Sequence, residues 1–192
     1  MSVLEKASIF DLMKIHSRYM QDFPKGERKP YWMILSNYYL RGRSDVLVLK
    51  EEGSIISYAI TLKKSRYAYI LVDYLDTFSE YRSKGYGKIM LQKLKEFYHD
   101  KAGILVEIEA LGQGDTDGEN ILRDRRWSFY EKNGFRMEDV ELILFGIPMH
   151  MLYLPIQIQE HPASVCDIAY DIYHQGIGKK FTDKNIFVRK KD

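Results

Sequence analysis

Between residues 81 and 88 the sequence reads Tyr81-Arg82-Ser83-Lys84-Gly85-Tyr86-Gly87-Lys88, and this stretch lies between a predicted strand and a predicted helix. Two glycines two residues apart allow the backbone to turn tightly and to approach a ligand without a Cβ in the way. The N-terminus of the helix would point free N–H groups and the positive end of its dipole toward the loop. The cationic side chains of the stretch add positive charge there. The pattern predicts a pyrophosphate site, and a tight turn with a solvated basic face is the alternative.

This loop differs from two common phosphate-binding loops. A Walker A loop requires Gly-x-x-x-x-Gly-Lys-Ser/Thr, which the stretch lacks. A dinucleotide-binding fingerprint would place its third glycine at position 90, where this chain has Met90. Met90 belongs instead to the apolar face of the following helix, together with Leu91, Leu94, Phe97 and Tyr98. The loop is therefore neither of these two motifs.

Hydrophobic periodicity on both sides of the loop predicts the other elements. Helices are expected at residues 9–20, 31–40, 87–101, 119–133 and about 163–174, followed by a basic tail. Strands are expected at 45–50, 55–62, 68–75, 104–110, 140–145 and 149–154. Strands that alternate with helices in the middle of the chain favour an α/β or α+β sandwich with a mixed sheet.

Length and composition indicate one globular domain. The 192 residues fit a single domain with a sizeable core, and 45% apolar and 29% charged residues argue against disorder. We divide this domain, 1–192, into a helical N-terminal part (1–43), a core sheet with the cofactor site (44–155), and a C-terminal helix and tail (156–192). The 29 basic and 27 acidic residues nearly cancel, so no nucleic-acid partner is expected.

The sequence also bears on compartment and membrane association. Cys166 is the only cysteine, so no intrachain disulfide forms and a reducing, cytoplasmic setting is expected. The start of the chain has no signal-peptide pattern. The apolar run 142–158 is too short for a spanning helix, and Gly146-Ile147-Pro148 in it indicates a turn between two buried strands. We therefore expect a soluble protein with no membrane partner; dimerisation through this strand pair or the C-terminal helix stays open.

Two motifs together carry a family resemblance. Arg82-x-x-Gly85-x-Gly87, preceded by the strand 69–75, resembles the acetyl-CoA signature of the GNAT superfamily of N-acetyltransferases. Further along, Phe129-Tyr130-Glu131-Lys132-Asn133-Gly134-Phe135 resembles the second motif of the same superfamily. The resemblance is strong over 68–135, extends to Leu154, and is weak before Ser44. It implies a GNAT-type sandwich, with a mixed, mostly antiparallel sheet flanked by helices on both sides.

The resemblance implies acetyl-CoA as the cofactor. Backbone amides of the loop would hold its pyrophosphate, and the last residues of the preceding strand would present backbone groups to the pantetheine arm and the thioester carbonyl. An N–H there would stabilise the oxyanion that forms when an amine attacks. The cofactor-binding residues that the resemblance implies are Leu75, Asp76, Thr77, Arg82, Lys84, Gly85, Tyr86, Gly87 and Lys88.

Two further residues are the catalytic candidates. Tyr130 matches the tyrosine that protonates the departing thiolate in many family members, and a core tyrosine without this function is the alternative. Glu107 sits where several members keep a glutamate that accepts the proton of the amine, directly or through water. Glu109 alternates with apolar residues in the same way as Glu107, so both point to one face. A solvated face is the alternative for this pair, and Glu109 or water stays open as the base.

The acceptor is expected to be a small-molecule amine that attacks the thioester directly in a ternary complex. Asp76 replaces a small residue of the family and would help to recognise a cationic substrate. The acceptor pocket is expected between the region 31–40, with Tyr31, Trp32, Tyr38 and Tyr39, and the strand pair near His150. Three alternatives stay open: an acetyltransferase for a protein amine, an acyl-CoA-binding module without catalysis, and a loop for some other phosphate.

Other residues depart from the pattern or carry no site. Many relatives have an asparagine at the position of Arg123, and the following Arg125 and Arg126 form either a phosphate contact or an exposed face. The histidines are scattered and no metal-binding motif occurs, so no metal is expected. His150 is interpreted as a core residue. Cys166 lacks the sequence context of a nucleophile, so no acyl-enzyme is expected.

Overall fold

The computed structural model describes residues 2–25, 28–63, 65–161 and 163–191. The strands form one sheet in the order β1-β2-β3-β4-β5-β8-β7-β9, and β6 pairs with β8. The strands are β1 (Val3–Lys6), β2 (Ser44–Glu51), β3 (Ser54–Leu62), β4 (Ile70–Thr77), β5 (Gly103–Glu109), β6 (Arg136–Met137), β7 (Val140–Leu144), β8 (Ile147–Pro155) and β9 (Ile186–Lys190). The helices are α1 (Ile9–Asp22), α2 (Tyr31–Leu35), its π-helical continuation η1 (Ser36–Leu40), the 3₁₀ turn η2 (Ser79–Tyr81), α3 (Tyr86–Phe97), α4 (Asp117–Lys132), α5 (Val165–Ile177) and α6 (Lys179–Asn185).

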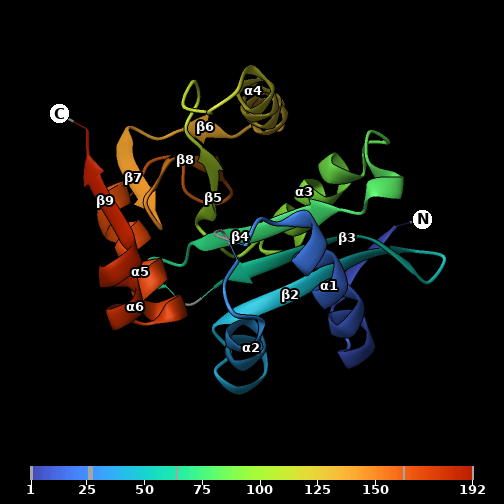
Figure 1. The fold of residues 1–192 in the computed structure, drawn as a ribbon. Coiled ribbons are helices and arrows are strands. Elements are labelled where there is room, and N and C mark those ends of the chain that lie inside the picture. The colour runs from blue at the N-terminus through green and yellow to red at the C-terminus, as the bar shows by residue number, and fades with distance from the viewer. Residues whose placement is uncertain (1, 26–27, 64, 162, 192) are drawn as a thin grey trace.

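Helices cover both faces of the sheet, as the family resemblance implied. Ile70 and Val72 of β4 pack with α3 on one face, whereas Leu71 points to the opposite face, where α5 packs. The α1 helix covers that second face over β2 and β3, and Figure 1 shows α1 and α2 on the viewer's side of these strands. Because successive side chains of a strand point to opposite faces, apolar strands such as β4 supply two cores at once.

A bulge in β4 separates the two central strands. Ile60 and Thr61 follow one another in β3, but their partners in β4 are Tyr74 and Val72, so Asp73 is an extra residue. A bulge of this kind bends the strand that carries it. The parallel pairing of β4 with β5 covers only three residues of each strand and ends at Val72, next to the bulge. Beyond this point β4 and β5 diverge, and only their outer edges remain paired, β4 to β3 and β5 to β8.

The structure corrects several predicted boundaries. The predicted helix 87–101 ends at Phe97, followed by turns. The turn between β7 and β8 is Phe145-Gly146, and Pro148 lies inside β8. The short β1 was not predicted from the sequence. In the described part of the chain every helix is too short or too polar to cross a membrane.

The predicted basic tail is wrong in a way that affects the site. Residues 179–185 form α6, and β9 pairs antiparallel with β7 at the edge of the sheet. Ile186 and Val188 of β9 are buried while Phe187 between them is exposed, which is the alternation of a half-buried strand. The strand was not predicted because lysines and an arginine surround this short pattern, so the segment looked like a basic tail. Figure 1 shows β9 and α6 beside β7 and α5.

Candidate active site

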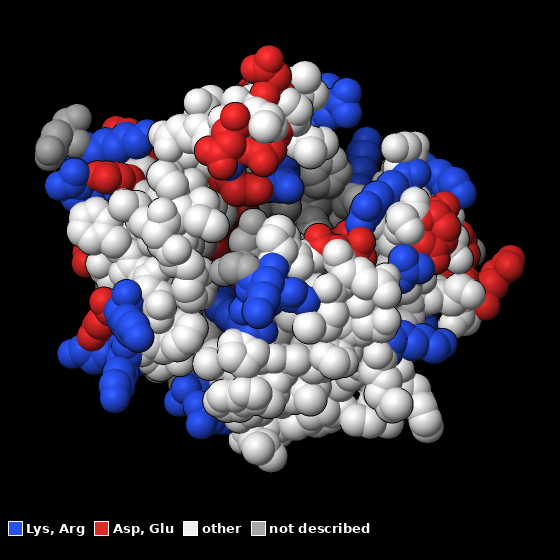
Figure 2. All heavy atoms as spheres, viewed as in Figure 1, with Lys and Arg blue, Asp and Glu red and all other residues white. Residues whose placement is uncertain are grey.

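A cavity of about 850 Å³ lies where β4 and β5 diverge. It is lined by β4 and β5 from the point where their pairing with each other ends, by the loop before α3, by α4, by the end of α1 and by the β7–β8 turn. Figure 2 shows the surface hollowed between α4 and α3, with acidic side chains at the rim. The predicted catalytic residues and most of the predicted cofactor-binding residues line this one cavity; Lys84 and Lys88 are exposed beside it.

The loop before α3 has the geometry of an anion site. Gly85 caps α3 with φ of +85°, a conformation that side-chain-bearing residues rarely adopt. The first bond of the helix runs from Ile89 N to Gly85 O, so the amides of residues 86–88 have no partner within the helix. A Cβ on Gly87 would lie 3.2 Å from Cζ of Phe129, so this glycine lets α3 approach α4 closely. The two glycines therefore serve different purposes.

The guanidinium group of Arg82 is hydrogen-bonded to other groups of the protein. Its Nε donates to the carbonyl oxygen of Thr77 at 2.8 Å, and its Nη2 lies 3.0 Å from Asp76 Oδ1 and 3.1 Å from Asp22 Oδ1. Lys84 Nζ donates to the carbonyl oxygen of Glu80. Arg82 thus ties the loop to the end of β4 and to α1, a role that the sequence did not indicate.

The end of β4 presents a free edge toward the cavity. Asp76 and Thr77 pair with Tyr58 and Ser57 of β3, and Ser57 Oγ also donates to the carbonyl oxygen of Asp76 at 2.6 Å. On the opposite edge β4 has no described strand partner after Val72, because β5 has moved away. An extended ligand arm between the two strands would find unpaired backbone groups there.

Glu107 follows directly after Val106, the last residue of β5 that pairs with β4. Its Oε1 is buried without a hydrogen-bond partner among the described residues. Burial raises the pKa of Glu107 to about 8; the ammonium of Lys29 opposes this rise and the carboxylate of Asp73 adds to it. A carboxyl group with a pKa near neutrality is suited to exchange a proton with a ligand.

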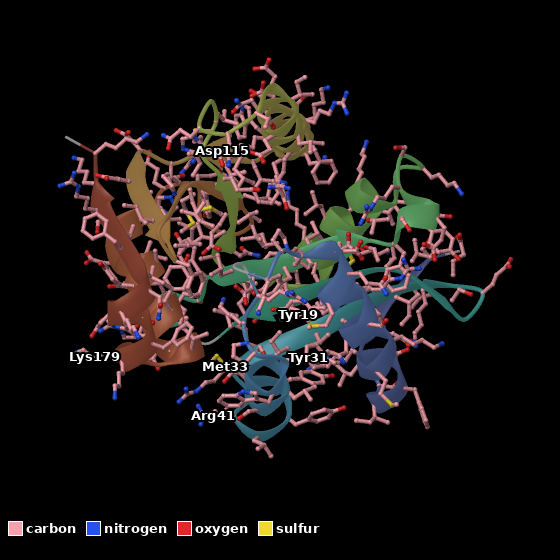
Figure 3. The ribbon with its side chains drawn as sticks, in the orientation of Figure 1. Tyr19, Tyr31, Met33, Arg41, Asp115 and Lys179 are labelled. Carbon is pink, nitrogen blue, oxygen red and sulfur yellow. The ribbon has the colours of Figure 1, made fainter. Side chains whose placement is uncertain are left out.

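Lys29 and Asp73 form a buried ion pair beside Glu107, and sequence reasoning missed both. Tyr19 and Tyr74 hold the backbone of Lys29: the Tyr19 hydroxyl donates to its carbonyl oxygen, and its N–H donates to the Tyr74 hydroxyl, both at 3.0 Å. Figure 3 shows Tyr19 near Tyr31, with ring centroids 5.7 Å apart. The sequence signal that could have indicated Asp73 is an aspartate inside an otherwise apolar strand. Lys29 lies in a loop that has no recognisable sequence pattern.

Tyr130 faces the cavity from α4, on the face of the sheet opposite to Glu107. Its side chain is 6% exposed and packs between the rings of Phe129 and Phe135, with centroids 5.1 Å away in each case. Burial raises its pKa to about 12, partly offset by Arg126, so the hydroxyl stays protonated and able to donate. The structure therefore places a protonated hydroxyl group and a titratable carboxyl group at one cavity.

The neighbouring charged residues are already paired. Glu109 forms an ion pair with Arg126 of α4, whereas Glu107 has a free oxygen. Arg123 Nη1 donates to the carbonyl oxygen of Ala110 and so joins α4 to the end of β5. His150 Nε2 accepts from Leu111 N at 3.2 Å. Among the described residues no group of side chains is arranged to hold a metal ion.

The walls of the cavity agree only partly with those that the sequence analysis expected for an acceptor pocket. The β7–β8 pair contributes Leu144, Phe145, Ile147 and Met149, as expected. None of the four aromatic residues expected from 31–40 is among the described lining residues; the Tyr31 hydroxyl, for example, donates to the carbonyl oxygen of Leu12. Their place is taken by Phe23 and Pro24 after α1, and by Tyr173 of α5. The expectation for 31–40 is wrong because α2 lies over a part of the sheet that is distant from the diverging ends of β4 and β5 (Figure 1).

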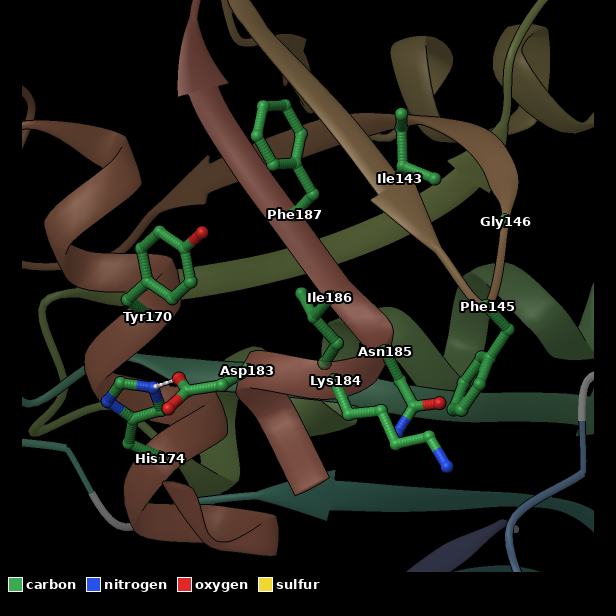
Figure 4. A pocket seen from close by; sticks show the side chains of 10 residues that line it. All are labelled: Ile143, Phe145, Gly146, Tyr170, His174, Asp183, Lys184, Asn185, Ile186 and Phe187. Carbon is green, nitrogen blue, oxygen red and sulfur yellow. Dashed lines mark hydrogen bonds and ion pairs between the residues drawn. The ribbon is translucent and has the colours of Figure 1, made fainter. Parts of the chain in front are cut away.

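A second cavity of about 900 Å³ lies outside this site, between β9, α6 and the β7–β8 turn (Figure 4). Its polar feature is the contact of His174 Nε2 with Asp183 Oδ1 at 2.8 Å. Phe145 and Ile186 line both cavities. The C-terminal segment therefore contributes to the wall of the main cavity.

Comparison with known proteins identifies the family. The model of the acetyltransferase (GNAT) domain matches residues 42–137, half of the chain. No curated protein matches the sequence. The matched segment contains the loop at Gly85, the bulge at Asp73 and both catalytic candidates.

Several solved structures share the fold. A putative GNAT-family acetyltransferase from Bacteroides thetaiotaomicron has a TM-score of 0.65 and 18% identity, covering 92% of this chain and 99% of its own. The ribosomal-protein-S18-alanine N-acetyltransferase of Escherichia coli has a TM-score of 0.62 and 16% identity, covering 85% of this chain and 99% of its own. Spermidine N-acetyltransferase from Vibrio cholerae, solved with CoA and spermine, has a TM-score of 0.61 and 11% identity, covering 81% of this chain and 95% of its own. At these identities the likeness shows the fold alone.

Proposed function

Because the chain belongs to the GNAT acetyltransferase family, we propose that it transfers the acetyl group of acetyl-CoA to a primary amine of a small molecule. One observation carries the proposal. In the cavity between the diverging strands, Glu107 has a buried, unpartnered oxygen on one face of the sheet, and Tyr130 offers a hydroxyl from the other. An amine and a thioester that meet between them would have a base on one side and an acid on the other.

The cofactor would lie along the opening. The free amides of residues 86–88 at the start of α3 would bind the pyrophosphate, and the unpaired edge of β4 from Asp73 to Thr77 would bind the pantetheine arm. The thioester would then lie near Leu75 and Asp76, where a backbone N–H can stabilise the oxyanion. Arg82 would act by holding the loop in place through Thr77 and Asp76.

The reaction requires two proton transfers. The acceptor reacts as the neutral amine: its nitrogen attacks the thioester carbonyl and loses one proton to Glu107, directly or through water. As the C–N bond forms and the C–S bond breaks, Tyr130 donates a proton to the sulfur, which leaves as the free thiol of CoA. Glu107 and Tyr130 then return to their starting states by exchange with solvent. No covalent intermediate on the protein is required.

The walls of the acceptor side support a small molecule rather than a protein amine. Phe23 and Pro24 bound it from the α1 side, and Phe145 and Tyr173 bound it from the opposite side. Relatives in fold include enzymes named for spermidine and for the alanine of a ribosomal protein, so the fold does not select between the two classes.

The test has two stages. Thermal unfolding with acetyl-CoA, CoA, ATP and NAD in parallel should show stabilisation by the two CoA species alone. A panel of small amines is then screened for release of the CoA thiol, with Glu107→Gln and Tyr130→Phe as matched variants. Stabilisation by CoA without thiol release from any amine would indicate a binding module. No stabilisation at millimolar CoA would contradict the proposal.

A further inference from the structure

Helix α1 and the segment α2–η1 together expose a large apolar surface. Six of their large apolar residues are 52% to 83% exposed: Ile9, Phe10, Met13, Trp32, Tyr39 and Leu40. At these exposures they present about 800 Å² to solvent, taking about 200 Å² for each large side chain. The largest apolar patch of a typical monomer covers about 300 to 600 Å². The apolar surface of α1 and α2–η1 is therefore large for a protein that has no partner on it.

The two segments form one surface because they are bonded to each other. The Tyr31 hydroxyl of α2 donates to the carbonyl oxygen of Leu12 in α1 at 2.7 Å. The Tyr38 hydroxyl of η1 donates to the carbonyl oxygen of Ala7, just before α1, at 3.1 Å, and the ring of Tyr39 lies 4.8 Å from that of Tyr38. Figure 2 shows the lower part of the molecule, over α1 and α2 of Figure 1, as largely free of charged side chains.

The scarcity of charge on this surface bears on what covers it. Charged residues make up 29% of the chain, yet within 9–22 and 31–40, which the structure describes in full, Lys14 is the one exposed lysine, arginine, aspartate or glutamate. Arg18 is partly buried in its ion pair with Glu80. A helix that lies on a membrane surface is instead rich in lysine and arginine on its polar face. A surface with little charge can be placed against its own copy without repulsion between like charges.

We propose that the apolar surface of α1 and α2–η1 binds the same surface of a second copy of this chain, so that the protein is a two-fold symmetric dimer. The area agrees with this partner, because a stable interface of standard size buries about 800 Å² on each side. The composition agrees as well, because the cores of interfaces are enriched in aromatic residues and methionine and depleted of charged residues. None of the six residues is among the described residues that line the active-site cavity, so the contact is independent of the proposed chemistry. The strand pair β7–β8, which the sequence left open as a dimer contact, already has β5 and β9 on its two edges.

Analytical ultracentrifugation of the full chain over a range of concentrations tests the proposal. We expect a species with twice the mass of one chain, and Phe10→Glu and Trp32→Glu should each raise its Kd about tenfold or more, as for residues central to an interface. Both positions are exposed and lie in the first turn of their helices, where a glutamate is favourable, so the fold should be retained, as checked by circular dichroism. Phe187→Glu is the matched control, because Phe187 is 44% exposed on β9, outside the surface. The Kd should change little with salt, since the contact is apolar.

Three outcomes would overturn the dimer surface. The first is a monomer at every concentration of the unmodified protein. The second is a dimer whose Kd is unchanged in both Phe10→Glu and Trp32→Glu, or one that only Phe187→Glu disrupts, which would place the contact elsewhere. The third is a monomer that sediments with vesicles of phosphatidylcholine and phosphatidylserine and loses this binding in the two glutamate variants, which would assign the surface to lipid. A dimer that both glutamate variants weaken and Phe187→Glu leaves intact supports the proposal.

Discussion

The ammonium of Lys29 and the carboxylate of Asp73 form a buried ion pair beside Glu107, at the point where β4 leaves β5. Their side chains are 7% and 5% exposed, so solvent screens them little. The two charges act on Glu107 in opposite directions: Lys29 lowers its pKa and Asp73 raises it. Because Asp73 is also the bulge residue, the feature that opens the cavity also places a charge next to the proposed base.

Replacing either member of the Lys29–Asp73 pair should shift the pH profile of kcat/KM, in opposite directions for the two replacements. Lys29→Met leaves Asp73 as the nearby charge, so the pKa of Glu107 should rise and the kcat/KM profile should move to higher pH. Asp73→Asn leaves Lys29, so the profile should move to lower pH. A shift of one pH unit changes kcat/KM about tenfold on the limb where Glu107 titrates. Profiles that move in the same direction would show that the pair acts only by supporting the fold.

In the unmodified protein kcat/KM should rise with pH through about 8, the raised pKa of Glu107, because the base must be ionised to accept a proton. Glu107→Gln should abolish this limb and lower kcat by about 10² to 10⁴. Acetyl-CoA should stabilise this variant against heat as it does the parent protein. A retained limb in the Gln variant would assign the titration to another group.

The same group makes the folded state sensitive to pH. The pKa of Glu107 is higher in the folded protein than the value of 4.5 for an exposed glutamate, so its contribution to stability falls as pH rises from about 4.5 to about 8. Glu107→Gln cannot ionise and escapes this loss. The variant should therefore melt a few degrees above the parent protein at pH 8.5. The two melting temperatures should converge near pH 5, as measured by differential scanning calorimetry.

Tyr130→Phe separates proton donation from packing. The ring remains between Phe129 and Phe135, so the melting temperature and acetyl-CoA affinity should stay near those of the parent protein. The kcat should drop by about 10² because the thiolate leaves without a proton donor. Acceptor turnover is measured by thiol release at saturating acetyl-CoA. An unchanged kcat would identify Tyr130 as a packing residue.

The contact between Gly87 and Phe129 links the two sequence motifs. In Gly87→Ala the new Cβ would lie 3.2 Å from the ring of Phe129, so the ring or the start of α3 must shift. We expect KM for acetyl-CoA to rise several-fold, about 1 kcal/mol of binding, as for modest overpacking. Phe129→Leu in the same chain removes the obstructing ring and should recover part of the affinity. An equal loss in the single and double variants would show that this ring is not the cause.

Much of the fold could be read from local patterns in the chain. The strand before the loop, the loop with Gly85 and Gly87, and the helix with Met90 and Leu94 are defined by residues close together in sequence, and the structure confirms each of these elements. Their backbone requirements, a positive φ at Gly85 and an apolar helix face, are properties of short segments. The family resemblance rested on these segments together with the second motif at 129–135, and the family match confirms it.

Other features depend on contacts between distant segments. Lys29 lies 44 positions from Asp73, and Arg82 lies 60 positions from Asp22, so no spacing rule connects either pair. Residues 186–190 form a strand because they pair with the edge of β7. The short apolar pattern among basic residues does not indicate this pairing. A pKa shift likewise requires burial, and Glu107 and Glu109 look alike in sequence although only Glu109 has an arginine partner. Secondary structure and backbone turns follow from neighbouring residues, whereas electrostatics and pocket walls follow from which segments the sheet brings together.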